Sequence, residues 1–216
     1  GYDAFSLDNT RQTLSDEPGR DTLQTHAGRL KWSSQGKVNL SAQLSVADTD
    51  TEYAYDEDWA YVGIAPALEY SSFDTYLRDR DMQSLEIRAD SDYDSWRWTV
   101  GGYLKHERET LTRQYTYLES DFNSALTVDT GAVFGQLDAN LTDTVTAFLG
   151  GRLEQRKADY ADSEKVNSDL TDNLWSGRLG IDWAPSPQQN FYLSISRGVR
   201  AGGPNSTLLS NGAVLS

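Results

Sequence analysis

The side chains best suited to nucleophilic or acid–base chemistry in this chain are its two histidines, His26 and His106. A serine, histidine and carboxylate group works only when the three side chains meet on one surface. In the alternating segments around them, His106 shares a face with Val100 and Leu104, and His26 shares one with Leu30. Both histidines are therefore expected on an outward, apolar face. No catalytic group is predicted, and we expect the chain not to be an enzyme.

Carboxylates are the second group with chemical potential, because residues 48–81 are dense in Asp and Glu. Asp48, Asp50 and Glu52 would line one face of an extended strand. Oxygen ligands suit calcium or magnesium, so these three residues are candidate ligands for a surface divalent cation. The spacing lacks the glycine and distal glutamate of an EF-hand loop, and a solvated acidic surface is the simpler interpretation. No resident cofactor is predicted.

The same acidic stretch carries a high density of aromatic residues. Aromatic faces stack on ring systems of a small molecule, and tyrosine hydroxyls add hydrogen bonds. Binding residues are often found in loops on a rigid scaffold, and the stretch is predicted to be such a loop. The alternative is that the aromatic rings pack the loop on itself. The candidate ligand-contact residues are Tyr53, Tyr55, Trp59, Tyr61, Tyr70, Phe73 and Tyr76.

These residues must be positioned by strands, because apolar and polar residues alternate with period two through most of the chain. In residues 173–184, for example, Leu179 and Ile181 share one face while Arg178 and Asp182 share the other. Such alternation is typical of a strand with two different environments. The predicted strands are residues 22–33, 37–48, 79–90, 95–106, 129–140, 144–157, 173–184 and 190–201.

Connection lengths distinguish a barrel from a soluble sandwich, which gives the same alternation. Short links alternate with long ones, so all short turns are predicted at one end of the sheet and all long loops at the other. The segments also have the length of a tilted membrane-spanning strand, about 9–11 residues. We therefore predict an all-β fold, an antiparallel up-and-down transmembrane β-barrel section of about eight strands with short periplasmic turns and long extracellular loops. The predicted long links are residues 49–78, 107–128, 158–172 and 202 onward.

Composition excludes two other classes of protein. The 216 residues have a net charge of −14 without a basic patch, which argues against nucleic acid as a partner. No stretch approaches the roughly 20 apolar residues of a transmembrane helix. A mean hydropathy of −0.62 is compatible with a barrel, because only alternate residues of each strand face lipid.

Four stretches, in order, resemble the barrel of TonB-dependent outer-membrane receptors. That family's pattern has an x-Q-E-L/I-R strand followed by a W-x-x-G-x-Y/F strand, a strand with Phe, Gly and Gln before a polar turn, and a strand ending in S-R-G-Y/F-K-x-G-G. The resemblance covers most of residues 22–205. The stretches are "MQSLEIRADSDYDSWRWTVGGYLKHERE" (82–109), "VFGQLDANLTDTVTAFLGGRLEQRKADY" (133–160), "SGRLGIDWAPS" (176–186) and "YLSISRGVRAGGPN" (192–205).

The resemblance implies a receptor in the outer membrane of a Gram-negative bacterium that takes up a nutrient, most often a ferric siderophore. Its expected partners are outer-membrane lipid and lipopolysaccharide, a small-molecule ligand, and the TonB complex through a plug region. Iron would enter only as part of the transported siderophore, and a surface divalent cation would bridge to lipopolysaccharide phosphates.

Residues 1–216 show no plug domain, TonB box or C-terminal strand, so we expect them to be part of such a barrel. The alternative is a self-contained small barrel, either an outer-membrane binding or adhesion protein or a lipocalin-like carrier with its apolar residues turned inward.

Overall fold

The computed structural model describes residues 19–58 and 71–203, and all regular structure in these ranges is β-strand. Among the described residues, no helix is long and apolar enough to cross a membrane. The eight strands are β1 (Arg20–Ser34), β2 (Asn39–Asp56), β3 (Phe73–Asp92), β4 (Trp96–Tyr115), β5 (Phe122–Thr142), β6 (Val145–Asp162), β7 (Asn167–Ser186) and β8 (Gln189–Arg197).

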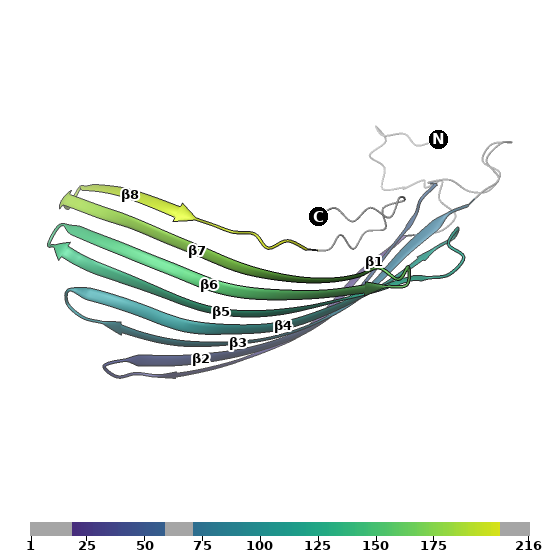
Figure 1. Ribbon diagram of the computed structural model, residues 1–216, viewed down its shortest axis with the longest axis horizontal. Helices are drawn as coiled ribbons and strands as arrows, with labels where there is room; N and C mark the ends of the chain where they lie inside the picture. Colours follow the sequence, from purple (N-terminus) through teal and green to yellow (C-terminus); the bar gives the residue numbers. More distant parts are fainter. Residues whose placement is uncertain (1–18, 59–70, 204–216) are drawn as a thin grey trace, which may run out of the picture.

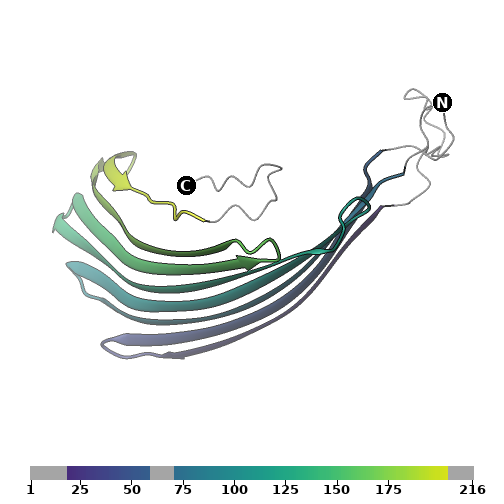
Figure 2. The ribbon, with the colours of Figure 1, turned by 45° about the vertical axis from the view of Figure 1, so that its right-hand side comes forward.

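The strands form one sheet in chain order, and each pairs antiparallel with the next. Figures 1 and 2 show a long sheet that curves like a trough. Within the described residues, β1 and β8 are its two edges and do not pair with each other. The fold is therefore an open, up-and-down wall, which confirms the predicted fold class.

The register separates the side chains into two chemically different faces. Leu44 pairs with Leu85 and Leu85 pairs with Leu104, so apolar side chains form continuous rows across strands. We call this the outer face, and the opposite one the inner face. On the outer face, the side chains of Leu104 and Leu179 are each more than half exposed.

A broad apolar band runs across the outer face through seven strands. A soluble protein rarely leaves so large an apolar surface in water, whereas a membrane-spanning wall requires one. A soluble carrier with inward apolar residues does not match this distribution. The band contains Leu40, Leu44, Val46, Ile87, Val100, Leu104, Val133, Leu137, Leu149, Leu153, Leu179, Ile181, Leu193 and Ile195.

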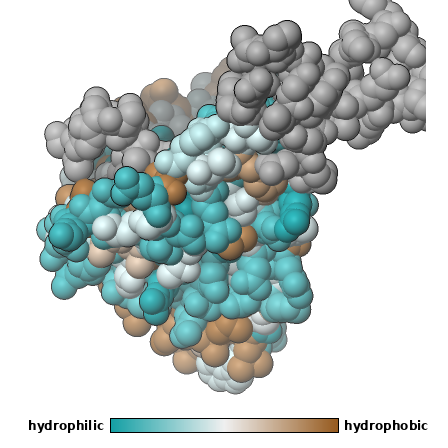
Figure 3. Space-filling view, turned by 90° about the vertical axis from the view of Figure 1, so that its right-hand side faces the viewer, coloured by the Kyte–Doolittle hydropathy of each residue, from teal (hydrophilic) through white to brown (hydrophobic). Residues whose placement is uncertain are grey.

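Aromatic residues gather where the short links lie. Trp96 is the first residue of β4, and its ring stacks on Tyr93 with centroids 5.0 Å apart. Trp183 of β7 packs against Phe191 of β8 at 5.5 Å. Amphipathic rings are favoured at a membrane interface, so this end of the wall fits one. The opposite end is mainly hydrophilic when viewed along the strands, with hydrophobic side chains along the lower edge (Figure 3).

Seven of the eight strands extend beyond the predicted segments at the end of the sheet where the long links are predicted, which corrects two of the four predicted long loops. The exception is β8, which ends at Arg197, four residues before the predicted end of that strand at residue 201. β4 and β5 are joined by residues 116–121, and β6 and β7 by residues 163–166. The link between β2 and β3 remains the longest between described strands, at residues 57–72. Pairing continues because backbone hydrogen bonds do not require an apolar face, while the prediction ended each strand where apolar alternation stopped.

Two glycines let aromatic rings lie flat on the inner face. A Cβ at Gly101 would stand 2.4 Å from the Phe134 ring, and one at Gly180 would stand 2.2 Å from the Phe148 ring. Each glycine is the cross-strand partner of the phenylalanine that covers it. A ring over a strand glycine shields the exposed backbone and fixes the register.

Candidate ligand-contact site on the inner face

The structure places the predicted aromatic residues differently from the sequence prediction. Tyr53 and Tyr55 belong to β2, and Phe73 and Tyr76 belong to β3, so these four lie on paired strands rather than in a loop. The prediction of a loop over them is wrong, because the two strands continue past the apolar band. Trp59, Tyr61 and Tyr70 lie outside the described residues.

Three of the tyrosines come together on the inner face. Tyr53 and Tyr76 are direct cross-strand partners, with ring centroids 6.3 Å apart, and Tyr55 lies 5.6 Å from Tyr53. Phe73 lies on the outer face, because its partner Asp56 shares the parity of the outer-face residues of β2. Tyr53 is 48% exposed, so it offers a free aromatic surface.

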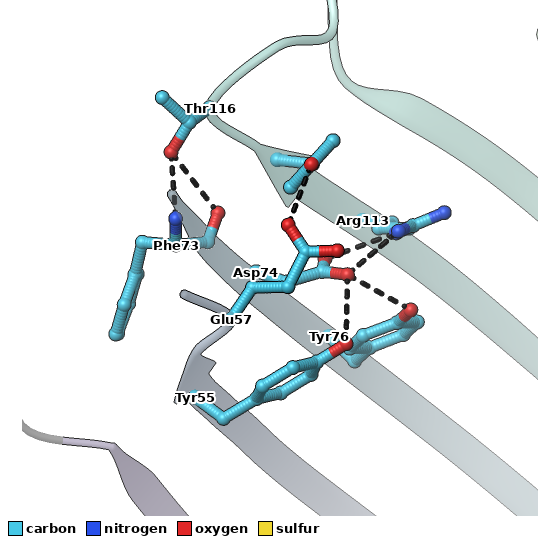
Figure 4. A network of polar contacts seen from close by, with 8 residues as sticks. Tyr55, Glu57, Phe73, Asp74, Tyr76, Arg113 and Thr116 are labelled. Carbon is cyan, nitrogen blue, oxygen red and sulfur yellow. Dashed lines mark hydrogen bonds and ion pairs between the residues drawn. The ribbon is translucent and has the colours of Figure 1, made fainter. Parts of the chain in front are cut away.

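A buried carboxylate, Asp74, organises this cluster (Figure 4). Its side chain is fully buried and accepts hydrogen bonds from Arg113 Nε to Oδ1 at 2.9 Å and from an Arg113 terminal nitrogen to Oδ2 at 2.6 Å. The hydroxyls of Tyr76 and Tyr55 donate to the same Oδ2 at 3.1 and 3.4 Å. Charge-assisted, two-pronged pairing of this kind fixes geometry as well as charge.

Arg113 is also held by aromatic rings. Its guanidinium carbon lies 5.2 Å from the Tyr76 ring centroid and 5.3 Å from that of Tyr115. The Tyr115 hydroxyl donates to Glu57 Oε2 at 2.6 Å. We call these residues the tyrosine cluster; its members are Tyr53, Tyr55, Glu57, Asp74, Tyr76, Arg113 and Tyr115.

The surroundings of the cluster, which lies beyond the apolar band, shift several pKa values. Burial, reinforced by the charge of Asp74, raises the pKa of Tyr76 to about 12. The hydrogen bond to Glu57 raises the pKa of Tyr115 to about 12, and burial raises the pKa of Tyr55. The hydrogen bonds from Arg113 to Asp74 raise the pKa of its guanidinium. At neutral pH the tyrosines are thus firmly neutral hydrogen-bond donors, and the Asp74–Arg113 pair carries no net charge.

Sequence reasoning did not find Arg113, Tyr115 or the central role of Asp74. Arg113 and Tyr115 fell in a predicted long link, although they stand two residues apart and so share one face if β4 continues. The recurrence of charged and aromatic residues at alternate positions of residues 107–115, in place of apolar ones, is the pattern that could have indicated the continued strand.

The predicted cation ligands are only partly brought together. Asp48 lies with Asp79 and Asp81 of β3, and one oxygen from each falls within 4.8 Å of the others on the exposed outer face. Asp50 pairs in register with Asp79 but is not in that group, and Glu52 is paired with Arg20 at 3.1 Å. The hydrogen bond with Asp81 and nearby negative charges raise the pKa of Asp48. A cation site here stays a prediction.

The histidines are separated by two strands. His106 Nδ1 lies 2.7 Å from Asp129 on β5, and His26 Nε2 lies 3.1 Å from Gln24 on β1. Both stand on the outer face, as predicted from the alternation. They are therefore not placed to act together.

Most ion pairs of the described residues lie on the inner face, within strands or between neighbours. Arg80 pairs with Glu107 at 2.5 Å across β3 and β4, and Arg152 pairs with Glu154 at 2.5 Å along β6. The inner face is thus polar and largely charge-compensated, as the wall of a water-filled or protein-filled interior requires.

The family to which this chain is similar agrees with the fold and the two faces described above. An open antiparallel wall with an apolar outer band, an aromatic belt and a charged inner face defines a portion of a transmembrane β-barrel. Residues 1–214 match the family described as TonB dependent receptor-like, beta-barrel. The chain therefore belongs to the TonB-dependent receptor barrel family, as the resemblance in the sequence implied.

Solved structures share the fold at low sequence identity. The ferric yersiniabactin uptake receptor FyuA from Yersinia pestis is 16% identical, with a TM-score of 0.72 over 86% of this chain and 29% of that one. The unliganded ferric citrate transporter FecA is 14% identical, with a TM-score of 0.60 over 82% and 28%. The copper transporter OprC is 13% identical, with a TM-score of 0.62 over 82% and 30%. A search of curated proteins gave no match.

This chain spans less than a third of the length of each of these three structures. Its family is one of transport receptors rather than enzymes.

Proposed function

We propose that this chain forms part of the wall of an outer-membrane receptor that imports a ferric siderophore in a Gram-negative bacterium. Membership of the TonB-dependent receptor barrel family supports transport. Iron as the cargo is supported by the uptake receptors that share the fold, among them those for ferric yersiniabactin and ferric citrate. The observation that carries the proposal is the apolar outer band opposite a polar inner face within that fold.

The tyrosine cluster is the proposed ligand contact of this portion of the wall. It lies on the inner face, beyond the apolar band and at the end away from the aromatic belt. The exposed ring of Tyr53 provides a stacking surface, and the Asp74–Arg113 pair holds Tyr55 and Tyr76 beside it. A rigid surface of aromatic rings suits the planar organic part of a chelate better than a free metal ion.

The proposed partners follow from the two faces. The apolar band would contact lipid, and the outer-face aspartates beyond it would face lipopolysaccharide. Energy for import would come from the TonB complex through a plug region of the full receptor. No resident cofactor is proposed, because iron would pass through as cargo.

The test is uptake in iron-limited cells. Cells that lack the full gene, cells that carry it and cells with the Tyr53→Ala variant would be given radiolabelled iron as a panel of siderophore chelates. We expect the gene to restore uptake of at least one ferric chelate, and Tyr53→Ala to weaken its binding with little change in receptor abundance. Tyr93→Ala, an aromatic substitution at the opposite end of the wall, is the matched control. Equal uptake of every chelate with and without the gene would contradict the proposal.

A further inference from the structure

A carboxylate lies beside the exposed ring of Tyr53 on the inner face. Asp21 of β1 is the direct cross-strand partner of Tyr53, and both side chains are exposed. Directly opposed residues of an antiparallel pair have their Cβ atoms about 4.5–5.5 Å apart, so the Asp21 carboxylate stands next to the ring. Among the described residues, Asp21 forms no ion pair. Its negative charge is therefore available to a ligand that reaches Tyr53.

The charged side chains of the tyrosine cluster do not balance Asp21. The cluster contains two carboxylates, Glu57 and Asp74, and one guanidinium, Arg113, which Asp74 already holds at 2.6 Å. Arg78, the next cation along the inner face of β3, pairs with a glutamate of β4 at 3.4 Å. Three carboxylates against one guanidinium leave an excess of two negative charges around the rings. Such a local field attracts cations and repels anions.

The tyrosine hydroxyls present acceptors rather than donors to a ligand. Tyr55 and Tyr76 donate their O–H groups to Asp74, and Tyr115 donates its own to Glu57. A phenol has a single O–H to donate, whereas its oxygen still accepts hydrogen bonds. The raised pKa values of these tyrosines keep the three hydroxyls protonated at neutral pH. Donor groups such as N–H therefore fit this surface better than further acceptors.

The rings of the cluster already hold one cation and leave one ring open. The Arg113 guanidinium carbon lies 5.2 Å from the ring centroid of Tyr76 and 5.3 Å from that of Tyr115. The plane of the Tyr53 ring is tilted by 35° to Tyr55 and by 40° to Tyr76, so these three rings form a shallow aromatic corner. Among the described residues, no cation lies over the ring of Tyr53. An exposed aromatic face next to a carboxylate suits an organic cation, which gains a cation–π contact and an ion pair.

We propose that the tyrosine cluster, together with Asp21, receives a positively charged group of the imported ligand, such as an ammonium. The excess negative charge would attract that group, the free ring of Tyr53 would lie against it, and the phenol oxygens would accept its N–H groups. The ligand class is thus a ferric chelate with a cationic end, rather than a polyanionic chelate. This inference rests on the proposed import function and names the charge of its cargo.

The experiment uses the full polypeptide that contains this wall, purified in detergent. The probes are ferrioxamine B, an iron trihydroxamate that ends in an ammonium, and its N-acetyl and N-succinyl forms. The three chelates share one iron core and differ in the charge of the end group, which is positive, neutral or negative. Calorimetry measures the affinity of each.

Two variants remove the features that favour a cation. Asp21→Asn removes the charge beside the ring, and Tyr53→Leu removes the aromatic face. The matched controls are Asp159→Asn, which removes the same charge on the outer face at the same end of the wall, and Tyr93→Leu, at the opposite end. All four side chains are exposed, so none of the substitutions opens a cavity in the sheet.

The ammonium form is expected to bind about tenfold more tightly than the succinyl form, with the acetyl form between them. Asp21→Asn and Tyr53→Leu are each expected to lower the affinity for the ammonium form about threefold or more, while both controls leave it unchanged. Added salt is expected to narrow the difference between the charged forms, because it screens exposed charges.

Three results would overturn the inference: no binding of the ammonium form, binding of the succinyl form that is equal or tighter, or equal effects of Asp21→Asn and Asp159→Asn. The uptake assay in iron-limited cells separates this failure from failure of the import function. Uptake of polyanionic chelates alone would leave the import function in place and overturn the inference about charge. Uptake of no chelate would contradict the import function itself, whatever the purified protein binds.

Discussion

Removal of the Asp74 carboxylate is expected to loosen the end of the wall that carries the tyrosine cluster. Asp74 is fully buried, and the Arg113 side chain keeps 21% of its exposure, so Asp74→Ala leaves a largely buried guanidinium without its anion. Breaking a buried ion pair from one side costs about 3–5 kcal/mol. Because Arg113 retains access to water and two ring contacts, we place the cost at the lower end, about 3 kcal/mol.

This cost acts locally, so the suitable assay is amide hydrogen exchange of the full receptor in micelles. A local loss of about 3 kcal/mol speeds exchange about a hundredfold for the amides released by opening of the β3–β4 pair. We expect faster exchange at Leu77 and Thr112, which pair beside the cluster. Amides at Leu137 and Leu149, at the opposite end, are expected to be unchanged.

Two further variants separate the charge from the loss of packing. Asp74→Asn keeps the shape but removes the charge, and is expected to cost nearly as much as Asp74→Ala. The double variant Asp74→Ala/Arg113→Met replaces the pair by apolar atoms and is expected to recover part of the loss. Unchanged exchange at Leu77 in Asp74→Ala would show that the pair does not hold this end of the wall together.

Three more outcomes follow from the structure. Tyr76 and Tyr115 bind their protons more tightly in the folded state, so the stability that they contribute is complete below about pH 10 and is lost as the pH rises through about 12. Tyrosinate absorbance that rises fully near pH 10 in the folded protein would contradict this. Gly180→Ala would place a Cβ 2.7 Å from the backbone oxygen of Leu193, and we expect it to lower the free energy of unfolding in urea by about 1–3 kcal/mol. The control Gly151→Ala is expected to be near neutral, because its Cβ would meet no atom closer than 3.8 Å. Equal urea midpoints for the two variants would refute the close contact at Gly180. Leu179→Arg on the apolar band is expected to cost about 2–4 kcal/mol in refolding into lipid vesicles, and a neutral result would argue that this position does not face lipid.

Strand order and the division into faces could be predicted from the sequence, because period-two alternation is fixed by strand geometry. The sheet keeps the predicted division in β7: Leu179 and Ile181 lie on one face, and Arg178 and Asp182 lie on the other. The ends of the strands could not be predicted in this way. Beyond Val46, β2 continues with residues such as Asp48 and Glu52 on its outer face, where water replaces lipid and alternation in hydropathy disappears.

The candidate site was predictable in its residue types and not in its arrangement. The aromatic density around Tyr53 and Tyr76 was visible, but their pairing depends on a register that the sequence alone does not fix. Arg113 reaches Asp74 from a strand 39 positions along the chain, so no local pattern links the two. The same dependence on register explains why Asp50 and Glu52 are not grouped with Asp48. The carboxylates grouped with Asp48 are those of Asp79 and Asp81, which belong to β3.

A cysteine scan of β7 in native membranes tests most directly whether this sheet spans the membrane. Residues 1–216 contain no cysteine, so each cysteine introduced between residues 176 and 183 is the only one in this stretch of the wall. Labelling by a membrane-impermeant maleimide and by a lipid-soluble one would be compared in membranes and in detergent. A membrane-spanning wall predicts labelling with a period of two: the lipid-soluble reagent labels Leu179 and Ile181, and the aqueous reagent labels Arg178 and Asp182, where the interior is open. Uniform access to the aqueous reagent along the strand would contradict a membrane-spanning wall.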